Sequence, residues 1–102
     1  MDRISMLRKF IEQKPQDPFP RYALSLELKG QGDAAGAAKE LERLLELKSD
    51  YLAAYLQLGM LQQSLGQMEA ARATFARGQG VARIQGNSHT LSELTSALDS
   101  LS

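Results

Sequence analysis

Apolar residues recur through most of the chain at intervals of three and four positions, the period of an amphipathic helix. The first stretch shows this pattern at Ile4, Leu7 and Ile11, and Met6 and Phe10 widen its apolar face. The strict alternation that marks a half-buried strand is nearly absent. We therefore predict six helices, over about residues 3–14, 19–29, 34–47, 51–65, 67–85 and 90–101.

Short breaks rich in proline, glycine, serine and aspartate separate these segments. Asp17 is expected to cap the second helix, with Pro18 at the first helical position, where its missing N–H costs little. Asp33 is expected to cap the third helix in the same way. For the fourth helix the sequence offers Ser49 or Asp50 as the cap.

The sequence matches itself when it is shifted by 34 residues. Four identities fall in register: Leu24 on Leu58, Gly32 on Gly66, Ala37 on Ala71 and Arg43 on Arg77. The first helix joins this register through three apolar pairs: Leu7 with Leu41, Phe10 with Leu44 and Ile11 with Leu45. A fixed period of this length is typical of a repeat array, in which each unit buries its apolar face against its neighbours.

The repeat resembles the tetratricopeptide repeat (TPR) family, whose 34-residue helix-turn-helix unit has the pattern W-x2-L-G-x2-Y, then A-x3-F, then P. The second unit carries Tyr55-x2-Leu58-Gly59-x2-Gln62 and then Ala71-x3-Phe75. The first unit carries Arg21-x2-Leu24-Ser25-x2-Leu28 and then Ala37-x3-Leu41. The chain departs from the family pattern in having no tryptophan, in Gln62 where an aromatic residue is expected, and in Ser49 and Arg83 where proline is expected.

The resemblance covers about residues 18–83 and implies an all-α fold, a right-handed α-solenoid of antiparallel helix pairs. We predict a single domain over residues 1–102. Its parts are a half-unit helix (3–14), a first repeat (18–50), a second repeat (51–85) and a C-terminal capping helix (88–102). The last helix carries Leu91, Leu94, Leu98 and Leu101 on one face, as the end of a solenoid requires. In an alternative, this helix exchanges into the groove of a second chain and forms a dimer.

Close packing explains the residue types of the repeat. A small residue is needed where the two helices of a unit cross, so we expect Ser25 and Gly59 to face Ala37 and Ala71. Larger residues, Leu24 and Leu58 on one helix and Leu41 and Phe75 on the other, are expected to fill the space beside the crossing. Gly32 and Gly66 are expected to adopt the left-handed conformation that ends the first helix of each pair.

The glycine-rich stretch from Lys29 to Leu41 is therefore interpreted as a turn between helices. A dinucleotide-binding loop needs a preceding strand and G-x-G-x-x-G spacing, but here a helix precedes the glycines and Ala35 occupies the third glycine position. A P-loop is excluded because no Gly-Lys-Ser/Thr sequence occurs.

Composition and charge argue against several classes of function. Twelve basic residues balance twelve acidic ones among 102, and no basic stripe suitable for nucleic-acid phosphates is visible. No cysteine is present, so no disulfide or thiolate is available. The start of the chain has no signal-peptide core, and no segment approaches the roughly 20 apolar residues of a membrane helix. We expect a cytoplasmic protein that binds no cofactor, nucleic acid or membrane.

No group of residues suits catalysis or metal binding. His89 is the only histidine, and with no second imidazole beside it we interpret it as a surface residue. Glu40, Glu42 and Glu46 alternate with Lys39, Arg43 and Lys48 and are interpreted as a solvated helix face. The serines of the last segment lack a triad context and are expected to be caps and solvent-facing residues: Ser88, Ser92, Ser96, Ser100 and Ser102. We therefore predict a protein that is not an enzyme.

The resemblance implies a binding groove, because the first helices of successive TPR units line a concave surface that holds a peptide. The residues carried over by register are Phe19, Tyr22, Ala23, Leu26 and Lys29 from the first unit, and Ala53, Leu56, Gln57, Met60, Gln63 and Ser64 from the second. Helical spacing independently places Phe19, Tyr22 and Leu26 on a face distinct from that of Leu24 and Leu28.

The apolar character of this groove points to its partner. Family members that hold acidic chaperone C-termini use lysine, asparagine and arginine, whereas this surface is mostly apolar. We predict a protein-interaction module for an apolar or amphipathic segment of a protein partner. Two alternatives stay open: neighbouring helices cover part of the stripe, or the stripe or the last helix forms a homodimer.

Overall fold

A computed structural model describes residues 2–101 of the chain. Among these residues there are six helices and no strand, so the predicted all-α class is confirmed. The helices are α1 (Arg3–Gln13), α2 (Pro18–Gly30), α3 (Ala34–Leu47), α4 (Leu52–Ser64), α5 (Met68–Gln85) and α6 (Ser88–Asp99). Each begins and ends within about three residues of its predicted bounds. None of the helices in this part of the chain is long and apolar enough to cross a membrane. Ser102 lies outside the described residues.

Two of the three predicted caps are confirmed. The Asp17 carboxylate accepts a hydrogen bond from Phe19 N at 3.1 Å, and that of Asp33 accepts from Gly36 N at 2.8 Å. These bonds satisfy amides that a helix start leaves without partners. The expectation of Ser49 or Asp50 at α4 is wrong: Tyr51 precedes the helix and makes no side-chain capping bond.

Asp2, which the sequence reading did not single out, caps α1. Its Oδ1 accepts from Ser5 N at 2.8 Å. The bond from the Ser5 backbone, with a second from the Ser5 side chain, stabilises the charged carboxylate and lowers the pKa of Asp2 below its ordinary 3.8.

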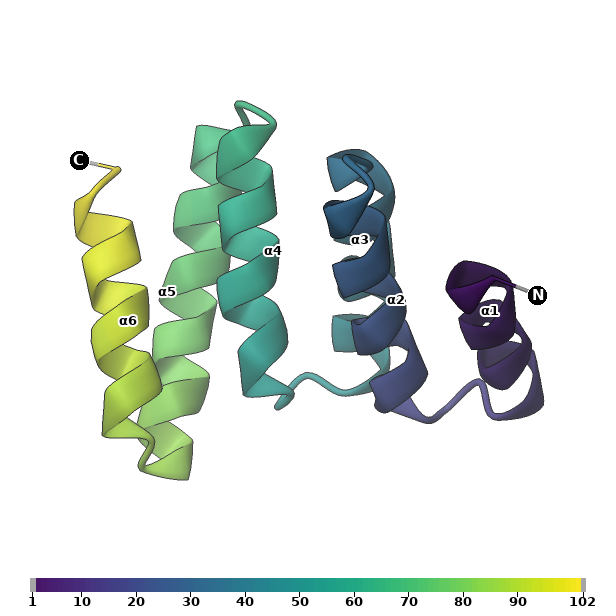
Figure 1. Cartoon of the computed structure of the whole chain (residues 1–102). Helices are drawn as coiled ribbons and strands as arrows, with labels where there is room; N and C mark the ends of the chain where they lie inside the picture. Colours follow the sequence, from purple (N-terminus) through teal and green to yellow (C-terminus); the bar gives the residue numbers. More distant parts are fainter. Residues whose placement is uncertain (1, 102) are drawn as a thin grey trace. The chain divides into compact units, whose positions relative to one another are not determined.

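The chain divides into two compact units, the first ending at Ser49 and the second beginning at Asp50. In the first unit α2 packs against both α1 and α3 (Figure 1). The buried apolar residues of this unit are Leu7, Ala23, Leu24, Leu28, Ala37, Ala38, Leu41, Leu44 and Leu45. Arg3 Nε on α1 lies 2.6 Å from Glu27 Oε1 on α2, so an exposed ion pair adds to the apolar contact between these helices.

In the second unit α5 packs against both α4 and α6, and α6 also contacts α4 (Figure 1). A buried cluster joins the three helices through Leu52, Ala71, Phe75, Ala82 and Leu94, with Leu56, Val81, Leu91, Ala97, Leu98 and Leu101 packed around it. The leucine face of the last helix therefore lies on the core, as its spacing predicts. Polar bonds add to this contact: Gln79 Nε2 donates to Thr95 Oγ1 at 3.0 Å and Arg72 to the Leu101 carbonyl at 2.8 Å.

Gly78 determines how closely α6 approaches α4 and α5. It is buried, and a Cβ added there would lie 2.7 Å from Tyr55 Cβ on α4 and 3.1 Å from the Leu94 methyl groups on α6. Side chains from both neighbouring helices thus use the space that the missing methyl leaves.

The turns inside both helix pairs have the predicted conformation. Gly32 has a φ of 85° and Gly66 a φ of 78°, values that residues with a Cβ rarely adopt. Behind each glycine the chain bonds back to the preceding helix, from Asp33 N to Leu28 O at 2.9 Å and from Gln67 N to Gln62 O at 2.8 Å. The glycine-rich stretch is thus a helix-to-helix turn.

Gly59 meets Phe75 where α4 and α5 cross. The atoms nearest to the missing Cβ of Gly59 belong to the Phe75 ring, which a methyl group there would overlap. The nearest neighbour of Gly59 is thus Phe75, so the small residue makes room for a large one. In the first unit the equivalent residues are Ser25 and Leu41, both buried. Ser25 is slightly larger than Gly59, and Leu41 is correspondingly smaller than Phe75.

A buried hydrogen bond explains the departure from the family pattern at Gln62. Thr74 Oγ1 on α5 donates to Gln62 Oε1 on α4 at 2.6 Å. Both residues are buried. A polar residue is tolerated where an aromatic one is expected because the neighbouring helix supplies its partner.

We predict that Gly59→Ala destabilises the protein by about 1–3 kcal/mol, because the new methyl group overlaps a buried ring that has little room to move. Gly80→Ala is the matched control: Gly80 lies inside α5 and has nothing within 4 Å of its missing Cβ. There alanine should stabilise by about 0.5–1 kcal/mol through helix propensity. Urea unfolding measures both changes, and equal effects of the two substitutions would contradict this account of the crossing.

Candidate functional site

The first unit exposes an apolar stripe on α2, which we call the α2 stripe and define as Phe19, Tyr22 and Leu26. Phe19 is 65% exposed and Leu26 43%, while Tyr22 is half-buried. Pro18 and the Asp17 cap start the helix directly before this stripe and so fix where its first ring stands. Of the other two residues predicted from this unit, Ala23 is buried and Lys29 is exposed.

The second unit exposes a smaller and more polar surface on α4, the α4 patch, consisting of Ala53, Gln57 and Met60. Met60 is 40% exposed, Ala53 is exposed and Gln57 is half-buried. The Gln63 side chain is half-buried, and the Ser64 hydroxyl donates to the Leu61 carbonyl at 2.8 Å.

Leu56 belongs to the core of the second unit, where it packs against the cluster around Phe75 and Leu94. Helical spacing gave no sign of this, because the cluster is built by residues of α5 and α6 as well as of α4. Apart from the buried Ala23, the remaining predicted residues lie at the surfaces of α2 and α4, each within its own unit. The groove that would join the two surfaces stays a prediction.

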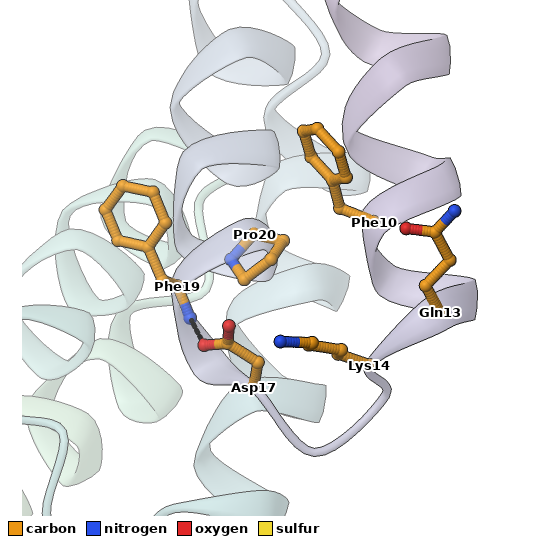
Figure 2. A pocket seen from close by; sticks show the side chains of 6 residues that line it. All are labelled: Phe10, Gln13, Lys14, Asp17, Phe19 and Pro20. Carbon is orange, nitrogen blue, oxygen red and sulfur yellow. Dashed lines mark hydrogen bonds between the residues drawn. The ribbon is translucent and has the colours of Figure 1, made fainter.

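An apolar hollow at the junction of α1 and α2 was not anticipated from the sequence. It measures about 420 Å³ and is lined by Phe10, Gln13, Lys14, Asp17, Phe19 and Pro20. Figure 2 shows the Phe10 and Phe19 rings on either side of Pro20, with Lys14 and Asp17 beneath. The available signal was the pair of phenylalanines flanking the proline-rich break, which sequence reasoning had treated only as a helix terminator.

The three glutamates of α3 do not share one environment. Glu40 Oε1 lies 3.4 Å from Arg21 Nη1 of α2, and the two side chains are only 20% and 12% exposed. The interpretation of Glu40 as part of a solvated face is therefore wrong, because it pairs with a cation of the neighbouring helix. Glu42 and Glu46 are exposed, and Glu46 pairs with Arg43 at 3.0 Å.

Arg21 is a largely buried charged side chain of the first unit. Its Nε is buried and has no hydrogen-bond partner among the described residues. Its Nη1 forms the ion pair with Glu40. Removing a single partner of such a pair leaves a charge that water reaches poorly.

His89 and the serines around it lie at the protein surface. His89 is almost fully exposed on α6, with Nε2 3.4 Å from Glu93 Oε1. Within this range no group of three or more histidine, aspartate or glutamate residues is arranged to hold a metal ion. Ser88, Ser92, Ser96 and Ser100 are exposed, as expected.

Comparison with known proteins agrees with the helix pairs and their turns. The tetratricopeptide repeat model matches residues 28–83, more than half of the chain. The chain belongs to the tetratricopeptide repeat family. TPR proteins generally mediate protein–protein interactions and are typically non-catalytic scaffolds.

The similar proteins include one curated sequence and two solved structures of particular interest. A TPR repeat-containing protein of Pseudomonas aeruginosa is 29% identical over 92 residues, 90% of this chain and 88% of that protein. A TPR domain protein of Salinibacter ruber is 39% identical, with a TM-score of 0.79 over 83% of this chain and 96% of its own. The TPR2B domain of yeast Sti1 is 13% identical, with a TM-score of 0.89 over 96% of this chain and 78% of its own. This last likeness shows the fold alone.

We predict that Glu40→Ala destabilises the protein by about 1–3 kcal/mol, because it leaves the Arg21 guanidinium without its ion pair in a largely buried place. Glu42→Ala on the exposed side of the same helix is the control and should change stability by less than about 0.5 kcal/mol. Thermal and urea unfolding test both variants. If the two variants are equally stable, the Arg21–Glu40 contact contributes nothing to the fold.

Proposed function

We propose that this TPR protein is a non-catalytic interaction module that binds an apolar or amphipathic segment of a partner protein. The α2 stripe and the α4 patch are its contact surfaces. The observation that carries the proposal is the exposure of Phe19 and Leu26 on the same helix whose opposite face, with Leu24 and Leu28, is fully used by the core. A helix that is apolar on both faces has one face available for a partner.

The chemistry of the two surfaces indicates what kind of segment would bind. A phenyl ring, a leucine and a methionine gain by losing water and offer no charge to a ligand. The polar groups beside them are Gln57 and Gln63 on α4 and Lys29 at the end of α2. The partner segment is therefore expected to be apolar along its contact face, with polar groups at its edges.

The affinity expected from this surface is modest. Full burial of one large apolar side chain contributes about 1.5–3 kcal/mol, and Phe19, Leu26 and Met60 are already partly covered. Association must also offset the lost freedom of the peptide. The Sti1 domain with a similar fold is described as a complex with pHsp70, which supports a protein partner without indicating which one.

Replacing Leu26 and Met60 together with aspartate should reduce partner capture at least about tenfold, because two charges would have to lose water on binding. Both side chains are exposed, so helicity by circular dichroism should be unchanged. Ile84→Asp is the matched control, since Ile84 is 88% exposed on α5 and lies in neither surface. Capture from native lysate, followed by mass spectrometry, compares the three proteins. Undiminished capture by the double variant would refute the two surfaces.

A homodimer is the second candidate function, and the packing of α6 supports considering it. This helix is attached mainly through one leucine face and two polar bonds, all of which a second copy could offer in the same geometry. An exchange of α6 between copies would leave the core chemistry unaltered.

Because those contacts are already made within one chain, we expect a monomer of 11.2 kDa. Light scattering over a wide concentration range measures the mass. A mass that doubles as concentration rises, and that returns to the monomer value when Leu98→Asp weakens the α6 face, would favour the dimer instead.

A further inference from the structure

We propose that the hollow between α1 and α2 receives one large apolar side chain of the partner segment, and that Lys14 pairs with an acidic group next to that side chain. The inference rests on the proposed function, because it describes how the same partner is anchored. It adds a specificity element from α1, a helix outside the predicted groove.

The exposure of Phe10 is the first observation. In the repeat register Phe10 matches Leu44, which is completely buried in α3, yet Phe10 is 46% exposed. Its ring and that of Phe19 form opposite walls of the hollow, and Pro20 is buried between them (Figure 2). Two phenyl rings held apart around open space leave apolar surface in water that an inserted side chain would cover.

The size of the hollow limits what enters it. Its volume of about 420 Å³ lies near the lower end of the range for small-molecule pockets, roughly 300–1,000 Å³. The hollow is open to solvent, so a side chain projecting from a bound segment can enter it. Phenylalanine or leucine suits the apolar walls, whereas alanine would leave most of their surface exposed to water.

The charges around the hollow favour an anion beside the anchor. The Asp17 carboxylate is engaged with Phe19 N at 3.1 Å, where the positive end of the α2 helix dipole offsets its charge. Within residues 2–101, Lys14 makes no ion pair or side-chain hydrogen bond. Its ammonium donors are therefore available beside the hollow, and a partner carboxylate next to the anchor would meet them.

Continuity with the α2 stripe connects the hollow to the rest of the proposed surface. Phe19 is both the first residue of the stripe and one wall of the hollow. A segment lying along Leu26 and Tyr22 reaches the hollow without crossing a polar gap on α2. The hollow thus lies at the end of the surface already proposed.

The test uses three short peptide amides that differ only in a central pair: Phe-Asp, Phe-Asn and Ala-Asp, each flanked by glycine and serine. Titration of the full chain, followed by amide chemical shifts in NMR spectra, should give changes centred on residues 10–20 with Phe-Asp. Ala-Asp should bind about tenfold more weakly, because the anchor is removed. Phe-Asn should bind about two- to fivefold more weakly, as expected for an exposed ion pair.

Two variants and a control assign these effects. Phe10→Ala should weaken Phe-Asp binding about tenfold. Lys14→Gln should abolish the difference between Phe-Asp and Phe-Asn and leave helicity unchanged, since Lys14 is exposed. Met6→Ala changes a side chain on the same helix, 41% exposed but outside the hollow, and should leave binding as in the wild type.

Three results would overturn the inference: no saturable shifts with Phe-Asp at about 5 mM peptide, equal binding of Phe-Asp and Ala-Asp, or shifts that lie outside residues 10–20. Failure of this inference is distinguishable from failure of the proposed function. If Phe10→Ala and Lys14→Gln capture the cellular partner normally while the Leu26/Met60 variant does not, only the hollow is refuted. If all three variants capture the partner normally, the proposed surfaces are refuted as well.

Discussion

The packing of a large side chain into the space left by a small one, where two antiparallel helices cross, is the contact on which this protein depends. In the second unit the Phe75 ring occupies the volume that a Cβ on Gly59 would take. In the first unit the buried residues at these two positions are Ser25 and Leu41, which differ less in size. Because interiors are packed as densely as organic crystals, each unit accepts its own pair of residues and few others.

In both helix pairs the second helix carries a polar residue at the same repeat position that bonds across to the first helix. Glu40 and Thr74 match in the repeat register, and each bonds across to the first helix of its pair, Glu40 to Arg21 and Thr74 to Gln62. The family pattern expects aromatic residues where Arg21 and Gln62 stand. The chain has replaced apolar packing by polar pairs there, and such pairs hold only when both partners are present.

The same packing determines which side chains are left for a partner. On α2 the core uses the face of Leu24 and Leu28, so Phe19 and Leu26 point outward. On α4, Leu56 packs against the buried cluster that α5 and α6 also supply, and less apolar surface remains. The proposed interaction surface therefore has most of its exposed apolar side chains on α2. At the start of that helix, Phe19 also forms one wall of the hollow at the end of α1.

The sequence by itself determined the helices, the 34-residue register, the caps at Asp17 and Asp33 and the left-handed turns at Gly32 and Gly66. Each of these depends on a few neighbouring residues, through helical period, capping chemistry or the freedom of glycine. Only the tertiary structure decided that Glu40 pairs with Arg21, that Leu56 joins the core and that Phe10 and Phe19 enclose a hollow. A periodic pattern tells which face of a helix is apolar, but what covers that face depends on the direction in which the next helix returns, and local sequence does not encode that direction.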